Sequence, residues 1–131
     1  KEDFAKWLAE RKQVALAEKE LTSKEWTLDE LLARGEKAYL TNCAACHQPT
    51  GAGLPPMFPP LNGSKIATGP AAGHIGIVLN GKSGTAMAAF GKQLSEVDLA
   101  AIITYERNAW GNKLGDMVTP KDILAFKKAQ E

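Results

Sequence analysis

The first part of the chain, residues 2–21, follows a helical pattern with little apolar content. Phe4, Trp7 and Leu8 recur at i, i+3 and i+4, the spacing of one helix face, while Ala, Glu, Lys and Leu dominate this segment. We predict a helix with a short apolar stripe near its start and an otherwise solvated surface. Residues 21–26 then read as a linker into the second part of the chain.

A second helix is predicted from Thr27. Glu30 follows three residues later, which is the spacing of a capping box. An apolar face then comprises Leu28, Leu31, Leu32, Ala38 and Tyr39. Gly35 lies within this face, where a glycine costs about 1 kcal/mol relative to alanine. We therefore expect another helix to cross closely at Gly35, and the predicted helix to lead into Cys43.

The remainder of the chain alternates loops with shorter helices. Residues 48–63 are dense in proline and glycine, and residues 81–91 form a second loop. Helices are predicted over residues 70–79, from the cap Ser95 to near Gly111, and from Thr119 onward. No segment alternates as a strand would, so the predicted class is all-α. Long loops in so small a domain indicate that a large apolar body, such as a porphyrin, fills the core.

Composition narrows the class of protein. The chain has 131 residues, of which 44% are hydrophobic, and its formal net charge is +1. One domain, or one small domain with a tail, fits that length. Dispersed Lys and Arg make nucleic acid and anionic membrane surfaces unexpected partners, and no apolar run is long enough to cross a membrane. Because the chain starts at Lys1, we expect a processed or excised fragment whose signal or anchor has been removed.

The two cysteines lie in the sequence Cys43-Ala44-Ala45-Cys46-His47. A single pair excludes a disulfide framework and a four-cysteine zinc site. The motif is that of c-type haem attachment: both thiols add to the vinyl groups of one porphyrin, and His47 ligates the iron. A thioredoxin-like redox pair is the alternative, but it requires a βαβ context that this pattern lacks. The sequence therefore predicts one covalent haem c.

Met87 is the predicted sixth ligand, in a loop of small residues that can lie against a flat ring. Met57 follows His47 by only ten residues and could do no more than pack against the haem edge, and Met117 reads as an ordinary apolar contact. His74 is expected to face solvent rather than to ligate. A His/Met pair raises the reduction potential and leaves no open coordination position. That combination favours electron transfer over catalysis.

From about residue 31 to residue 111 the chain resembles class I cytochrome c. Gly35 and Tyr39 match the glycine and aromatic residue of the family's N-terminal helix, and Ile102 and Tyr105 match their partners on its C-terminal helix. In the family these two helices cross at the glycine. The resemblance implies an all-α cytochrome c fold, with helices and long loops wrapped around the haem.

The same resemblance implies further haem contacts. Pro59-Pro60-Leu61 matches the family's Pro-x-Leu, so that the Pro59 carbonyl would accept a hydrogen bond from Nδ1 of His47, and Leu61 would contact the haem. Met87 falls where the family places its axial methionine. The candidate propionate contacts are Arg107, Trp110 and Lys82, although exposed residues near helix ends fit those positions equally well.

A narrower resemblance is to the cytochrome c domain fused to subunit II of bacterial haem–copper cytochrome c oxidases. It is carried by residues 85–91 and 103–112, and by flanks that are similar to the end of that subunit's copper domain (residues 4–9) and to its tail (118–123). The chain lacks the copper ligands and the membrane hairpin. We therefore expect an excised haem domain: residues 1–26 as a linker and residues 27–131 as the cytochrome c domain.

This narrower resemblance also implies partners and a location. Electrons would come from a donor cytochrome or a quinol–cytochrome c reductase and pass to the dinuclear copper domain of the same oxidase subunit. The domain would lie in the periplasm or on the outer face of the bacterial inner membrane, with the full-length protein membrane-anchored. The alternatives are a free periplasmic cytochrome c carrier and, in another class, a haem enzyme or gas sensor in which a ligand displaces Met87.

Overall fold

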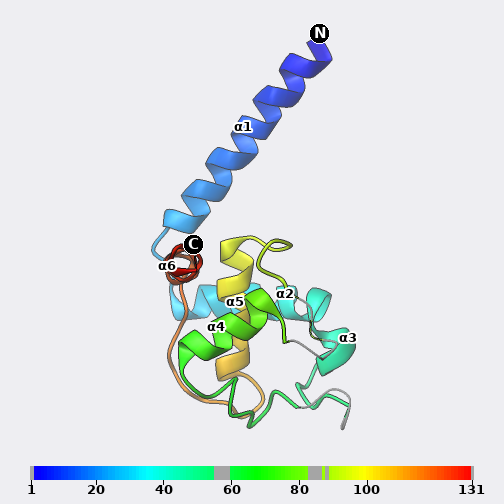
Figure 1. Ribbon diagram of the computed structural model, residues 1–131, viewed down its shortest axis with the longest axis vertical. Helices are drawn as coiled ribbons and strands as arrows, with labels where there is room; N and C mark the ends of the chain where they lie inside the picture. The colour runs from blue at the N-terminus through cyan, green and yellow to red at the C-terminus, as the bar shows by residue number, and fades with distance from the viewer. Residues whose placement is uncertain (1, 55–59, 83–86, 88, 131) are drawn as a thin grey trace.

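The computed structural model describes residues 2–54, 60–82, 87 and 89–130. Within them the regular elements are six α-helices, which confirms the predicted all-α class (Figure 1). They are α1 (Glu2–Ser23), α2 (Leu28–Asn42), α3 (Ala44–His47), α4 (Ala71–Asn80), α5 (Glu96–Asn108) and α6 (Pro120–Ala129). Met57 and Pro59 lie outside the described residues.

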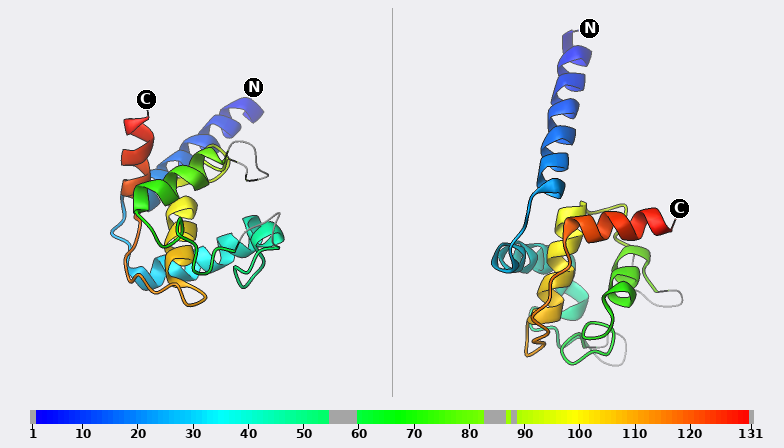
Figure 2. Two further views of the ribbon diagram at one scale, coloured as in Figure 1. Left: turned by 60° about the horizontal axis from the view of Figure 1, so that its bottom comes forward. Right: turned by 90° about the vertical axis from the view of Figure 1, so that its left-hand side faces the viewer.

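Helix α1 projects away from the other five helices (Figure 1 and the right view of Figure 2). Its apolar stripe is exposed: Phe4 is 63% and Trp7 50% accessible, and their rings stack with centroids 5.9 Å apart. The helix is mostly polar, as predicted, and no described helix is both long and apolar enough to span a membrane. Its end is fixed locally by Trp26, whose indole N–H donates to the Leu21 carbonyl over 2.7 Å.

The predicted capping box begins α2. The Thr27 N–H donates to Oε1 of Glu30 at 2.9 Å, and the Glu30 N–H donates to Oγ1 of Thr27 at 3.2 Å. These bonds satisfy two of the donors that a helix start otherwise leaves unpaired. Leu31 and Tyr39 on the apolar face are fully buried. The helix ends at the first haem-motif cysteine, Cys43, whose N–H donates to the Tyr39 carbonyl over 2.8 Å.

Helix α2 crosses α5, and the crossing is fixed by one close approach and one ion pair. A methyl group at Gly35 would overlap the backbone carbonyl of Ala101 and lie 2.8 Å from Cβ of Tyr105. Beside it, Nε of Arg34 donates to Oδ1 of Asp98 over 2.8 Å. The expected close crossing at Gly35 is thus confirmed, and it places the end of α2 beside the core face of α5.

The second packing layer joins α4, α5 and α6. Its buried cluster comprises Ile75, Val78, Leu79, Leu99, Ala100, Ile103, Val118 and Ile123. Thr104 ties the segment before α6 to α5, because its hydroxyl donates to the Val118 carbonyl at 3.0 Å and accepts from the Val118 N–H at 2.9 Å. Helix α4 therefore lies against the side of α5 that α2 leaves free, as Figure 2 shows.

Candidate haem site

The haem motif forms a single helical turn at the end of α2. The N–H groups of Cys46 and His47 both donate to the Cys43 carbonyl, over 3.3 and 3.0 Å. This turn brings both thiols and the imidazole together. Cys43 is buried and Cys46 is exposed, and both are free thiols rather than a disulfide. The turn predicted from the motif spacing is therefore present.

The surroundings of Cys43 do not suit a redox-active thiol. Burial, the nearby Glu106 carboxylate and Cys46 together raise the pKa of this thiol to about 12, with burial as the largest cause. Reactive cysteines have lowered pKa values because the thiolate is the nucleophile. A thioredoxin-like role is therefore disfavoured, and an apolar wall beside Cys43 suits a porphyrin instead. That wall is the cluster of Tyr39, Cys43 and Ile102, with Ala38, Ala44, Leu61, Leu94, Tyr105 and Trp110 packed against it.

The imidazole of His47 has a second ring nitrogen, Nδ1, which in a haem ligand is normally hydrogen-bonded so that the ring is held in place. Its Nδ1 is buried and finds no hydrogen-bond partner among the described residues. Its backbone carbonyl accepts from the Gly53 N–H over 2.9 Å, which folds the following loop back onto the motif. Buried ring nitrogens of ligating histidines normally donate to a carbonyl or carboxylate, which fixes the tautomer and ring orientation. The residue expected to supply that carbonyl, Pro59, lies outside the described part of the chain.

An aromatic cluster holds the segment after His47. The Tyr39 hydroxyl donates to the Gln48 carbonyl over 2.7 Å, and Gln48 itself has a positive φ of 68°. The Tyr39 ring contacts Tyr105 and Trp110, with centroids 5.5 and 5.0 Å away. Burial raises the pKa of the Tyr39 phenol, so it remains a hydrogen-bond donor at neutral pH.

Trp110 and Gly51 form a close contact on the same side. The Trp110 indole N–H donates to the Pro49 carbonyl over 2.9 Å. Gly51 has a φ of +69°, and a side chain there would overlap the Trp110 ring. Its carbonyl accepts from the N–H of Leu61 over 2.7 Å. Leu61 is thereby held against the apolar cluster that contains Cys43.

Asn112 is a structural residue of the site that the sequence reasoning did not single out. Its amide donates to the carbonyls of Leu61 and Glu106 at 3.1 and 2.9 Å, and its Oδ1 accepts from the Gly63 N–H at 2.7 Å. The side chain is buried and links the end of α5 to the loop that carries Leu61. Its position directly after Trp110-Gly111, in the stretch that carries the oxidase resemblance, is the signal that could have identified it.

Met87 is half-buried, and its carbonyl accepts from the Lys82 N–H over 3.3 Å. Met117 is 41% exposed. His74 is not solvent-facing, which corrects the expectation from sequence. It is 2% exposed, and its Nε2 lies 2.7 Å from Oε1 of the equally buried Glu106. The reason is that His74 lies on the face of α4 that packs against α5, where the Glu106 carboxylate pairs with it.

The candidate propionate contacts occupy different environments. Arg107 is buried rather than exposed, and its guanidinium pairs with Asp116 through Nη2 and Oδ2 at 2.8 Å. Trp110 is half-buried in the aromatic cluster, and Lys82 is exposed. Of these three residues, only Lys82 is exposed.

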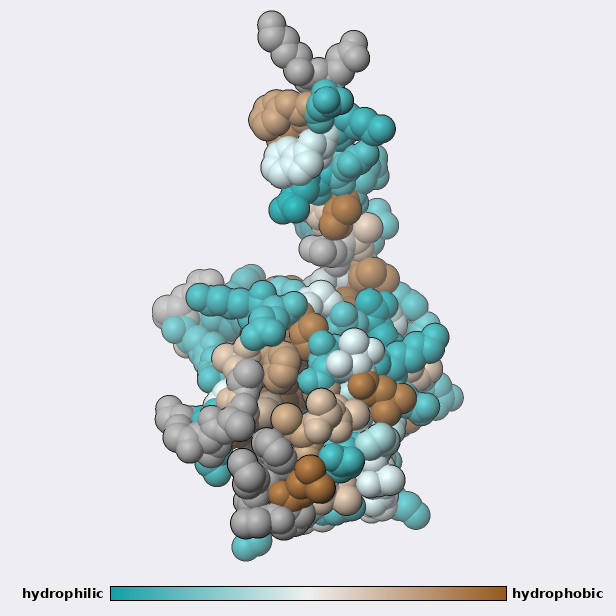
Figure 3. All heavy atoms as spheres, turned by 90° about the vertical axis from the view of Figure 1, so that its right-hand side faces the viewer, coloured by the Kyte–Doolittle hydropathy of each residue, from teal (hydrophilic) through white to brown (hydrophobic). Residues whose placement is uncertain are grey.

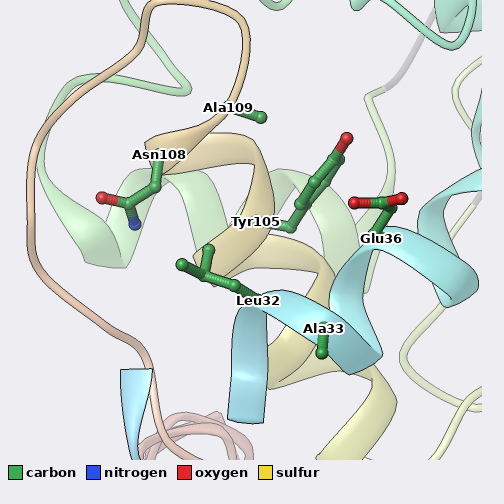
Figure 4. Close-up of a pocket in the computed structure, with 6 residues that line it drawn as sticks. All are labelled: Leu32, Ala33, Glu36, Tyr105, Asn108 and Ala109. Carbon is green, nitrogen blue, oxygen red and sulfur yellow. The ribbon is translucent and has the colours of Figure 1, made fainter. Parts of the chain in front are cut away.

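The surface also carries a pocket away from the motif. It measures about 260 Å³ and is lined by Leu32, Ala33, Glu36, Tyr105, Asn108 and Ala109 (Figure 4). No residue of the haem motif lines it. Burial and the Glu36 carboxylate raise the pKa of the Tyr105 phenol beside this pocket.

Apolar surface gathers on the face seen in Figure 3, and the exposed large apolar residues of the domain include Leu40, Leu54 and Ile66.

Comparison with known families decides the identity. Residues 30–105 match the family described as cytochrome c oxidase, cbb3-type, subunit III. The chain belongs to the cytochrome c family. Its cofactor is accordingly haem c, and its domain is an electron-transfer module.

Several curated relatives of this cytochrome are subunits of dehydrogenases. The cytochrome c subunit of alcohol dehydrogenase (quinone) is 31% identical in Gluconacetobacter polyoxogenes and 33% in Gluconobacter oxydans (strain 621H), each over 103 residues and 71% of the chain. The gluconate 2-dehydrogenase cytochrome c subunit of Pantoea cypripedii is 31% identical over 108 residues, or 72% of the chain. The chain spans only 22–24% of the length of these relatives.

The residues of this cytochrome fit a covalently bound haem. Two free thiols share one helical turn with a histidine, whose buried Nδ1 has no hydrogen-bond partner in the part of the chain that the structure describes. The adjoining wall is apolar and aromatic. Haem edges require such a wall because the porphyrin is a large hydrophobic body. The chain therefore has the chemistry of attachment, ligation and burial in one place.

Proposed function

We propose that Cys43 and Cys46 hold the haem through thioether bonds, with His47 and Met87 as its axial ligands. We further propose that the domain passes single electrons from a donor cytochrome or a quinol–cytochrome c reductase to the dinuclear copper centre of a terminal oxidase. The observation that carries the proposal is the turn from Cys43 to His47, with two free thiols and a buried imidazole nitrogen that has no hydrogen-bond partner among the described residues.

The bound haem would supply a one-electron centre whose potential is set by its axial ligands and surroundings. The chain's own residues would do the rest. The carbonyl of Pro59 would accept from Nδ1 of His47 and fix its ring. Leu61, Ile102 and Tyr39 would keep water from the porphyrin's inner edge. Cys46 is exposed, so the thioether edge beside it would lie near the surface, where an electron-transfer partner can approach.

An oxidase acceptor is supported by the sequence around the domain. Residues 103–112 and 118–123 resemble the cytochrome c domain and tail of bacterial oxidase subunit II. The matching family is described as subunit III of a cbb3-type oxidase, which supports an oxidase in general rather than subunit II. Such a domain would work in the periplasm or on the outer face of the inner membrane, in a full-length protein anchored there. Its donor would bind transiently through a small, hydrated contact.

Residues 1–26 would serve as a linker to the copper domain, and residues 27–131 as the cytochrome domain. The projecting, largely exposed α1 supports this division (Figure 1). A covalent link keeps a donor at a high effective concentration near its acceptor. Deleting residues 1–23, which spares Trp26, should leave the haem spectrum unchanged and alter stability by only about 1 kcal/mol. Loss of haem ligation on that deletion would show that α1 belongs to the domain.

A second candidate arrangement, with a different electron donor, follows from the relatives, which are named as cytochrome c subunits of dehydrogenases. In that case the domain would take electrons from a dehydrogenase catalytic subunit. A free periplasmic carrier has the same haem residues and is distinguished by its partners alone. A gas sensor or haem enzyme is distinguished by carbon monoxide, which should not bind the reduced protein at neutral pH if Met87 fills the sixth position.

Stopped-flow mixing tests the acceptor directly. The haem-loaded full chain, reduced beforehand, is mixed with the oxidised soluble copper domain of a bacterial oxidase subunit II. In a parallel experiment the oxidised chain is mixed with a substrate-reduced quinone-dependent alcohol dehydrogenase catalytic subunit. The proposal predicts fast, saturable oxidation by the copper domain and slow reduction by the dehydrogenase. The reverse order of rates would assign the domain to a dehydrogenase complex.

A further inference from the structure

A cluster of four charged or titratable side chains lies between α4, α5 and the segment before α6. His74 is 2% and Glu106 4% exposed, and Nε2 of His74 lies 2.7 Å from Oε1 of Glu106. Arg107, also 4% exposed, pairs with Asp116 at 2.8 Å. The remaining imidazole nitrogen, Nδ1 of His74, is buried without a hydrogen-bond partner among the described residues.

Stability alone does not account for the His74–Glu106 pair. Removing two ionisable groups from water is costly, and replacing a buried ion pair by well-packed apolar residues of similar volume is often neutral or stabilising. The neighbours of Glu106 one turn earlier, Ile102 and Ile103, are fully buried, so an apolar residue would suit the same helix face. The pair therefore needs a reason other than packing.

Glu106 is electrostatically close to the haem-bearing segment. Burial is the largest cause of the raised pKa of Cys43 and of the raised pKa of Tyr39. The Glu106 carboxylate is the second largest cause for both groups. Its backbone carbonyl shares the Asn112 amide with the carbonyl of Leu61. A charge felt at the Cys43 sulfur would also be felt by a haem attached there, because buried charges are screened far less than surface ones.

The net charge of the pair depends on its protons. With His74 protonated and Glu106 ionised the pair is neutral, and after loss of one proton it carries one negative charge. The other charged groups packed around it are Arg107 and Asp116, which neutralise each other. Tyr39 on α2 is an uncharged phenol, and Lys127 on α6 binds the Gly91 carbonyl and lies 3.8 Å from Glu96.

We propose that the His74–Glu106 pair is a redox-linked proton site that sets the pH dependence of the haem's reduction potential. The inference rests on the proposed attachment of haem at Cys43. Reduction adds one electron at the iron, supplied by the physiological donor, and removes one positive charge from the haem. The pair then binds a proton from solvent more tightly. By linkage, the deprotonated, negatively charged pair favours the oxidised haem, so that the potential falls as pH rises.

Spectroelectrochemical titration of the haem-loaded full chain across the pH range tests this proposal. His74→Gln removes the imidazole that gives up the proton, and the double variant His74→Gln/Glu106→Gln keeps an amide–amide hydrogen bond without any charge, which guards against misfolding of the single variant. Glu36→Gln is the matched control, because it removes an exposed carboxylate one residue from the α2–α5 crossing. Covalent haem is checked by mass before each titration.

The potential of wild type should fall as pH rises, and this fall should be lost in both variants. The potential of the double variant should lie closest to wild type at acid pH and above it as pH rises. The Glu36→Gln curve should run parallel to wild type. Curves for His74→Gln and the double variant that also run parallel to wild type would overturn the inference alone. Wild-type protein that carries no haem would overturn the proposed function, and the inference with it.

Discussion

Gly35 of α2 lies directly against the backbone carbonyl of Ala101 in α5, so closely that a methyl group has no room there. Helix propensity favours alanine over glycine by about 1 kcal/mol, yet the crossing forbids it. The overlap is with backbone and with Cβ of Tyr105, neither of which can rotate away. The approach brings the aromatic cluster of Tyr39, Tyr105 and Trp110 together beside the haem motif.

Gly35→Ala should destabilise the domain by more than about 2 kcal/mol and lower its Tm by roughly 5–10 °C, as measured by thermal unfolding. Gly73→Ala in α4 is the matched control: that glycine is exposed and a methyl group there meets nothing within 4 Å. The control should gain up to about 1 kcal/mol. If both variants change stability in the same direction, the close crossing does not determine the outcome.

The ion pair between Arg107 and Asp116 predicts a pH-dependent contribution to stability. The hydrogen bond from Arg107 holds the pKa of Asp116 below its ordinary value of 3.8. A depressed carboxyl pKa adds stability above that ordinary value, and the contribution is lost as pH falls through the folded-state pKa. Because the Asp116 side chain is 45% exposed, the contribution at neutral pH is about 0.5–1 kcal/mol.

Asp116→Asn should therefore lower the free energy of unfolding at pH 7 by that amount, and the difference from wild type should close as the pH drops below 3.8. Urea unfolding at a series of pH values measures it. Asp3→Asn, on the projecting α1, is the control and should leave the domain's unfolding unchanged. If the difference in free energy of unfolding between wild type and Asp116→Asn stays constant with pH, the ion pair is not the source of the stability difference.

The helix boundaries were largely predictable because their signals are local. The Thr27–Glu30 capping box and the Thr119-Pro120 start lie within one turn of the helices they begin, and both are formed in the structure. What the sequence could not reveal is the pairing of His74 with Glu106, 32 residues later, since a side chain facing inward from a different helix leaves no local pattern.

In the haem site, too, features set by local spacing were predicted, and features that depend on distant segments were missed. The spacing of Cys43, Cys46 and His47 predicted their shared turn, because a helical turn fixes those positions. Burial of Arg107 was missed, since its partner Asp116 is supplied by an irregular segment. The joining role of Asn112 was missed for a related reason: it depends on three backbone groups in two separate segments.

Met87→Ala tests the proposed sixth ligand. The weak near-infrared sulfur-to-iron charge-transfer band of the oxidised protein should disappear, and the reduction potential should fall because a thioether favours Fe(II). Met117→Ala, at an exposed position, should retain both properties. Persistence of the band in Met87→Ala, or its loss in Met57→Ala, would move the ligand elsewhere.

The most direct test of the account is the mass of the denatured protein, made as the full chain in cells that mature c-type cytochromes, after acid-acetone extraction. Two thioether bonds from Cys43 and Cys46 should keep the mass of one haem on the wild-type protein through extraction. The variant Cys43→Ala/Cys46→Ala should lose its haem under the same treatment. Wild-type protein that emerges at the mass of the bare polypeptide would contradict covalent attachment at these cysteines.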